Sequence, residues 1–385
     1  MKRLLLVGLL LRLVGGLAYL YLIGNLYGGG DYLLYIGQGG ELSTSQGAGG
    51  VARVWDLNSW VGGRWWGVSF VSHIVGLLFA LVGPTTVGGF MAFSMVSYVG
   101  IVSLALAFHR TYPTIPLESY LVWIVLFPSL WFWPAALGKD AIVLCGVGLA
   151  TLGFVGRAGH PRWLMMILGT GLVFGIRPQV AAVLVVCLAA GQWGGAGGTW
   201  DLKRLVQSAL LIGAGVGAVY LASGQLGFSL FSTDEVEVYF ASKSAAVNKG
   251  GSALGMDTVS PWMAPVNVLF RPFVWEANGS TVLISAIEIL SVWILAWARR
   301  RQIAAFIRLH RKTRLFWFGI AFVALYSVAL GLSLTNMGIV ARQRVHILPF
   351  LFLAFAGPSP AAARATTWRK PSAPGYPRAG LSAVQ

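Results

Sequence analysis

Charged residues at the ends of apolar segments are the part of this chain most able to do chemistry. The chain has 385 residues, of which Asp and Glu together number only 12. An ionisable group near hydrocarbon is costly, so such a group usually marks a functional site. The candidate catalytic carboxylates are Asp31, Asp140 and Glu276, and the candidate phosphate-binding cations are Lys139, Arg177, Arg271, Arg342 and Arg344.

Asp31 follows three glycines, 28–30, where the first apolar run ends. Glycine lets the backbone turn as a helix leaves the membrane. A carboxylate at the edge of a low-dielectric region is suited to general-base catalysis. The alternative is a helix-capping aspartate in a wet loop.

Lys139 and Asp140 lie in a short turn between two apolar runs. Asp140 is placed to N-cap the following helix. Lys139 offers a cation beside it, and the N-terminus of that helix favours anions. The turn therefore predicts either a plain helix cap or part of an anion site.

The arginines occupy positions where a guanidinium can reach a phosphate. Pro178 holds the preceding Arg177 in an extended conformation between two short apolar runs. Arg342 and Arg344 flank a glutamine in the last predicted outer turn. The planar guanidinium fork matches phosphate geometry. For Arg177 the alternative is simple snorkelling to the membrane surface.

Two further charged groups are open to more than one interpretation. Arg271 and Glu276 are five residues apart among aromatic residues, which indicates either a salt bridge or a phosphate-binding arginine oriented by a carboxylate. Glu288 lies inside an apolar run, and we expect it to pair with Arg12, which lies inside another.

The elements that must position these residues are membrane helices. The chain is 57% hydrophobic and 10% charged, with a mean hydropathy of +0.74, whereas soluble domains are about 25% charged. The repeated apolar runs predict an all-α, polytopic membrane protein with about 10–11 transmembrane or re-entrant helices.

Charge placement predicts the topology. The most basic stretch, 299–314, is assigned to the cytoplasm, together with the loops 109–118, 157–162 and 201–204 and both termini. Eleven apolar runs are present, and termini on one side of the membrane require an even number of crossings. One run therefore does not span, which leaves ten crossings. We expect that run to be 69–84, which follows a tryptophan-rich stretch and is broken by Gly83–Pro84.

The predicted organisation is one transmembrane domain, 1–357, with long outer loops at 24–68 and 223–279. The first of these loops contains amphipathic segments, and 358–385 is expected to be a disordered cytoplasmic tail. The net charge of +16 lies mostly in short loops, as the positive-inside rule requires, which argues against nucleic acid as a partner. No zinc-type spacing or nucleotide-binding motif is present, so we expect no metal and no cofactor. The alternative is a divalent cation at the acidic run 234–237, which we otherwise interpret as a solvated stretch.

The layout of these residues resembles the bacterial integral-membrane glycosyltransferases of the GT-C type and the loosely related polysaccharide polymerases. The likeness rests on Asp31 soon after the first helix, a long first outer loop, a Pro128-Ser129…Lys139-Asp140 junction and outward arginines near the C-terminus. By this resemblance the family's extracytoplasmic base would fall on Asp31. One departure from the family is that Asp31 stands alone, where the family often has two adjacent acids.

The resemblance implies an enzyme of the bacterial inner (plasma) membrane. It would transfer a sugar from a polyprenyl-phosphate-linked donor to a glycan or lipid acceptor at the extracytoplasmic face, in cell-envelope polysaccharide or glycolipid assembly. Phosphate binding would fall on some of Arg177, Arg271, Arg342 and Arg344. The alternatives are a polysaccharide polymerase of O-antigen type and a flippase or transporter of a lipid-linked or anionic substrate.

Overall fold

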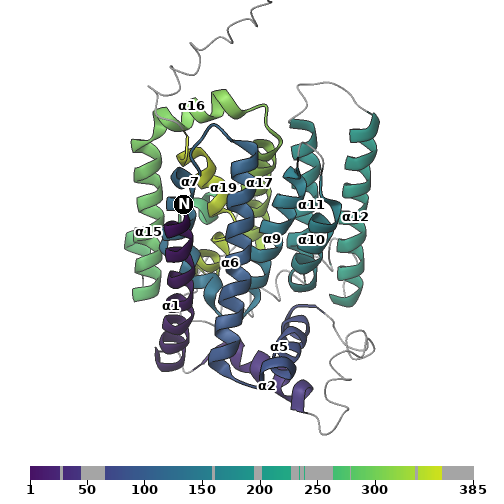
Figure 1. The fold of residues 1–385 in the computed structure, drawn as a ribbon, viewed down its shortest axis with the longest axis vertical. Helices are drawn as coiled ribbons and strands as arrows, with labels where there is room; N and C mark the ends of the chain where they lie inside the picture. The colour runs from purple at the N-terminus through teal and green to yellow at the C-terminus, as the bar shows by residue number, and fades with distance from the viewer. Residues whose placement is uncertain are drawn as a thin grey trace, which may run out of the picture.

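All elements of the described chain are helices, as the computed structural model shows (Figure 1). The structure describes residues 1–26, 29–44, 66–157, 161–194, 202–226, 263–277, 279–333 and 337–357, together with Asp234 and Val238. The predicted all-α class is confirmed for these ranges. Most of the predicted second outer loop, residues 27–28 and 45–65 of the first, and the predicted tail 358–385 lie outside them.

Four helices among the described residues are long and apolar enough to cross a membrane: α1 (Lys2–Leu26), α6 (Thr86–Thr111), α15 (Ser280–Ala298) and α17 (Arg314–Ser333). Two bent pairs raise the number to six if each pair is one span. The first joins α8 (Pro128–Phe132) and the short η1 (Trp133–Ala135) to α9 (Lys139–Val155) at 117°. The second joins α18 (Met337–Arg344) to α19 (Leu348–Phe355) at 53°. The described part of the chain is therefore α-helical, with four to six helices or helix pairs that are long and apolar enough to cross a membrane.

The remaining apolar helices are shorter than a full span: α5 (Val68–Val82), α7 (Leu117–Leu126), α10 (Trp163–Ile176), α11 (Pro178–Gly194) and the apolar part of α12 (Leu202–Leu226). The 14 residues of α10 rise only about 21 Å, against a hydrocarbon core of about 30 Å. Pro128 and Pro178 divide the apolar sequence here, because proline cannot continue a helix from the preceding turn. The predicted number of ten crossings stays a prediction.

The basic segments meet at one end of the helix bundle. There α16 (Arg300–His310) lies across the helix ends (Figure 1). The hydroxyls of Tyr112 and Thr313 are 3.1 Å apart. Arg110 donates to the carbonyl of Gly156 at 2.9 Å, which brings the 109–118 and 157–162 segments together. The described residues of the 109–118, 157–162 and 299–314 segments, which the sequence assigns to the cytoplasm, thus share one end of the molecule.

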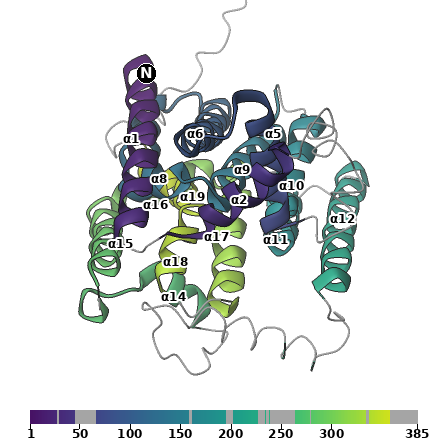
Figure 2. The same cartoon turned by 90° about the horizontal axis from the view of Figure 1, so that it is seen from below.

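The opposite end is covered by α2 (Asp31–Thr44) and α5, which pack against each other (Figures 1 and 2). Gly39 allows this contact, because a Cβ there would collide with Val75. Ser72 on α5 donates to the Gln38 side chain at 2.8 Å. The backbone N–H of Gly67, just before α5, donates to the carbonyl of Gly175 at 2.9 Å. This fixes the pair beside the end of α10.

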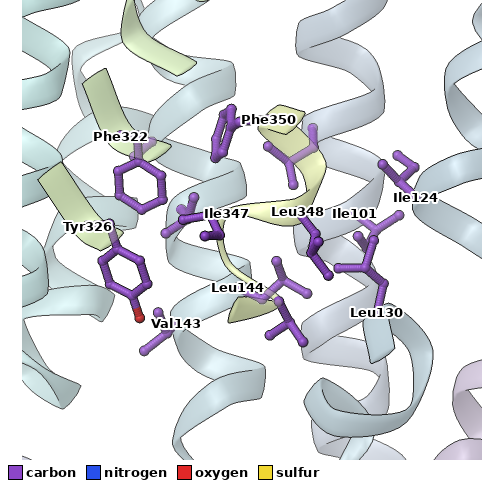
Figure 3. Packing of buried hydrophobic residues seen from close by; sticks show 14 of the residues in the cluster. Ile101, Ile124, Leu130, Val143, Leu144, Phe322, Tyr326, Ile347, Leu348 and Phe350 are labelled. Carbon is purple, nitrogen blue, oxygen red and sulfur yellow. The ribbon is translucent and has the colours of Figure 1, made fainter. Parts of the chain in front are cut away.

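The core surrounds α9, which is buried along almost its whole length. Its glycines face those of its neighbours: Gly148 meets the backbone of Gly100 on α6, and Gly146 meets Gly169 on α10. Such small residues let membrane helices approach closely. Around this helix the side chains interdigitate (Figure 3), as drawn for Ile101, Ile124, Leu130, Val143, Leu144, Phe322, Tyr326, Ile347, Leu348 and Phe350. The N-terminus of α9, with Lys139 and Asp140, is thereby held inside the bundle at the end that α2 covers.

Candidate anion-binding site

Asp140 is the centre of a buried charge cluster. Its side chain is only 4% exposed. One carboxylate oxygen accepts a hydrogen bond from Nε of Arg342, and the other lies 3.1 Å from Nη2 of Arg177. The predicted N-cap is wrong, because the residue at that position is Gly138 and no side-chain capping bond forms. Two guanidiniums attract the carboxylate more strongly than neutral backbone N–H groups do, since charge-assisted hydrogen bonds are about twice as strong.

The two arginines arrive from separate breaks in the helical structure. Arg177 ends α10, where its N–H donates to the carbonyl of Val173 at 2.7 Å, and Pro178 starts α11 directly afterwards. Arg342 lies near the end of α18, 202 residues from Asp140. Their side chains are 11% and 25% exposed. Two segments that are far apart in the sequence therefore converge on a single carboxylate of a third.

A small cavity adjoins this cluster. Its lining includes Tyr19, Asp31, Tyr32, Tyr35, Asp140 and Arg342, and the 133–138 turn closes one side. The volume is about 20 Å³, and about 10–15 Å³ suffices for a water-sized group. Asp31 is the first residue of α2 and is exposed, so it supplies a solvent-accessible carboxylate next to the buried one.

Cations outnumber carboxylates in this cluster. Lys139 is half-buried and lies within electrostatic range of Arg177, Asp31 and Arg342. The cluster therefore holds three cations, Lys139, Arg177 and Arg342, against the two carboxylates of Asp31 and Asp140. An excess positive charge at a low-dielectric site is costly unless an anion accompanies it. The arrangement favours binding of a negatively charged group.

Three tyrosines at this site have no counterpart among the predicted residues. Tyr19 comes from α1, and Tyr32 and Tyr35 come from α2. A usable signal was present, because Tyr35 is four residues after Asp31 and residues so spaced share one helix face. Behind the cluster, the Tyr326 hydroxyl lies 3.2 Å from Nδ1 of His346, which is fully buried.

Arg271 and Glu276 form a separate ion pair away from the cavity. Nε of Arg271 donates to Glu276 at 3.0 Å, and the backbone N–H of Phe273 donates to the same carboxylate at 2.9 Å. Burial opposes ionisation of Glu276, but these hydrogen bonds outweigh it and hold its pKa below the ordinary value. The salt-bridge interpretation is confirmed, and the structure does not bring these two residues to the cavity.

Arg344 also points away from the cavity. It donates to the carbonyl of Val268 at 2.7 Å and to that of Arg271. Both carbonyls belong to α14 (Ala264–Phe270) and the turn that follows it. The hydrogen bonds of Arg344 thus connect α18 to α14, while Arg342 on the same helix reaches Asp140.

The predicted pair of Glu288 and Arg12 is wrong. The Glu288 carboxylate accepts hydrogen bonds from the backbone N–H, at 2.7 Å, and from the hydroxyl of Ser129. Arg12 donates instead to the hydroxyl of Ser97 at 3.1 Å. Ser129 follows Pro128 in the first turn of α8, where backbone N–H groups have no partner within the helix. The broken helix therefore attracts the carboxylate.

Within the described ranges, no three His, Cys, Asp or Glu side chains are grouped as a metal site would require. Comparisons with protein-family models, with curated proteins and with solved structures found no match to this chain.

Proposed function

We propose that this protein is a membrane glycosyltransferase that takes a sugar from a polyprenyl-phosphate-linked donor at the extracytoplasmic face. The acceptor is a glycan or lipid of the cell envelope. One observation carries the proposal: the accessible carboxylate of Asp31 and a buried cluster with excess positive charge line the same cavity. A transferase of this kind needs both a base and a phosphate-binding group.

The cations are suited to bind the donor phosphate. Arg342 lines the cavity directly, and Lys139 and Arg177 add positive charge beside it. Asp140 holds both guanidiniums, so we assign it a positioning role instead of the catalytic role expected from sequence. Arg271, Glu276 and Arg344 support the fold around the site.

The proposed reaction uses Asp31 as the general base. Asp31 takes the proton of an acceptor hydroxyl, whose oxygen bonds to the anomeric carbon of the donor sugar. The bond between that carbon and the phosphate oxygen breaks, and its electron pair leaves with the phosphate. Cations at this oxygen stabilise the developing charge, and each well-placed donor contributes about 2–4 kcal/mol.

The charge of the cluster favours a monophosphate donor over a diphosphate donor. A sugar linked through a phosphodiester carries one negative charge, which the single excess cation balances. After transfer Asp31 is protonated, so the positive charge of the cluster rises from one to two, and the leaving phosphate monoester also approaches two negative charges. A diphosphate donor carries one more negative charge than the cluster can balance, both before and after transfer. Competition between monophosphate and diphosphate prenyl lipids for the purified protein tests this, and stronger competition by the diphosphate would contradict it.

The proposed orientation places the 299–314 segment and both termini in the cytoplasm. The α2–α5 pair, with the cavity, then faces the extracytoplasmic side of the plasma membrane. The gathering of basic segments at the opposite end supports this orientation. The donor's prenyl chain would lie among the membrane helices and the membrane lipids around them.

The proposal is tested in cells with and without the gene. Loss of the protein should remove a surface glycan and accumulate its lipid-linked donor. Cells that carry only Asp31→Asn should match the deletion while containing normal amounts of inserted protein. Unchanged glycans in both strains would overturn the proposal.

Two other functions remain as candidates. A polymerase of O-antigen type would use the same cavity with a longer lipid-linked glycan as donor. A transporter is favoured by one observation, the Glu288 carboxylate held by Ser129 where α7 breaks into α8, because transporters often bind ions at broken helices. Movement of a lipid-linked substrate across proteoliposomes, with no glycosidic bond formed, would favour the transporter.

A further inference from the structure

The hydroxyl of Tyr35 is a buried polar group without a hydrogen-bond partner among the described residues. The side chain is 1% exposed. Buried tyrosine hydroxyls usually have a partner, and leaving one unpaired destabilises a folded protein. Tyr35 lines the cavity that Asp31, Asp140 and Arg342 also line. The cavity is therefore the place where a partner for this hydroxyl can bind.

The position of Tyr35 follows from the way α2 is held. Asp31 and Tyr35 are separated by one helical turn, so both point to the same side of α2. The contacts of α2 with α5, through Gly39 and Gln38, fix that side toward the bundle. Tyr35 thus reaches the site from α2, whereas Arg342 comes from α18.

The hydroxyl is suited to donate and not to act as a base. Burial first, and then the nearby Asp31 carboxylate, raise the pKa of Tyr35 above its ordinary value. Tyr35 therefore keeps its proton at neutral pH. It can donate a hydrogen bond to an anion while adding no charge to the cluster.

We propose that Tyr35 is a ligand-binding residue whose hydroxyl donates a hydrogen bond to an oxygen of a bound phosphate group. This inference rests on the proposed function, because it takes the phosphate of the donor lipid as the anion. Arg342 supplies charge from one wall of the cavity, and Tyr35 orients the phosphate from another.

The test is Tyr35→Phe, which removes the hydroxyl and keeps the ring. The purified protein in detergent is titrated with geranyl monophosphate, a short prenyl phosphate, and binding and melting temperature are measured. A hydrogen bond to a charged group predicts about 10- to 100-fold weaker binding. The melting temperature without ligand should stay the same or rise, because the variant removes an unpaired buried hydroxyl.

Tyr112→Phe is the matched control at the other end of the molecule. Tyr112 is fully buried, and its hydroxyl is bonded to Thr313 at 3.1 Å. This variant should lower the melting temperature and leave geranyl monophosphate binding unchanged. A purely structural role for Tyr35 would instead make both variants lower the melting temperature, and that result would overturn the inference.

Arg342→Gln separates this inference from the proposed function. If the wild type binds geranyl monophosphate, Arg342→Gln loses binding and Tyr35→Phe binds within twofold of wild type, then the assignment of Tyr35 fails and the phosphate site stands. If the wild type does not bind it, both fail. Inorganic phosphate is titrated in parallel, and comparable binding of both probes would assign recognition to the phosphate group alone.

Discussion

Replacing Asp140 by asparagine should strongly destabilise this protein. The carboxylate is 4% exposed and is the shared partner of Arg177 and Arg342. Asparagine keeps the size of the side chain but removes the charge, so two guanidiniums remain buried without compensation. Removing one partner of a buried ion pair costs about 3–5 kcal/mol. We expect a loss of unfolding free energy in that range.

Asp31→Asn is the matched control, because it makes the same chemical change on the same cavity. Asp31 is exposed, and no ion pair of this residue is present within the described part of the chain. Exposed substitutions usually change stability by less than about 0.5 kcal/mol. Unfolding is followed by titrating each purified variant from mild detergent into dodecyl sulfate. Equal stability of the two variants would refute the view that Asp140 holds the cluster together.

A double variant strengthens this test. Arg342→Gln alone also breaks the contact, and Asp140→Asn with Arg342→Gln removes both charges. The two side chains interact directly. The double variant should therefore lose less unfolding free energy than the sum of the two single variants, by about 0.5–3 kcal/mol. Strictly additive losses would show that the two side chains do not interact in the folded protein.

Two further predictions concern the loop ion pair and the orientation. Glu276 has a lowered pKa in the folded protein, so its stabilising effect is complete above the ordinary glutamate value of about 4.5 and is lost as pH falls through the folded value. The melting-temperature difference between wild type and Glu276→Gln should be constant above about pH 5.5 and shrink below about pH 4; a constant difference down to pH 3 would contradict the pairing. For orientation, the native cysteines are buried, so single cysteines at exposed Lys312 and Glu41 report accessibility. An impermeant maleimide should label Glu41→Cys in intact cells and Lys312→Cys only after permeabilisation, and the reverse pattern would invert the proposed topology.

The sequence allows the class of fold and part of the site to be predicted. Apolar runs indicate membrane helices, and charge sorting brings the basic segments together at one end. The proximity of Asp31 and Asp140 is harder to foresee, because it depends on α2 folding back over the end of α9. The ion pair of Arg342 with Asp140 spans 202 residues, and local patterns carry no information on such contacts.

The different roles of Arg342 and Arg344 illustrate what local structure decides. The sequence predicts an extended turn here. In such a turn residues two apart point to the same side, so Arg342 and Arg344 would both reach one phosphate. The segment is helical, and residues two apart in a helix do not face each other. Arg342 therefore reaches Asp140, while Arg344 binds the carbonyls of α14. Recognising the short helix α18 from sequence would have separated these roles.

The central claim is that Asp31 acts as the base next to a phosphate-binding cluster. The most direct measurement compares wild type and Asp31→Asn, purified and supplied with a synthetic prenyl-monophosphate sugar and an acceptor glycan. We predict that the variant binds the donor at least as tightly as the wild type, because the change removes a negative charge from the cluster, and forms no glycosidic bond in a single turnover. Transfer by the variant at the wild-type rate would contradict the account.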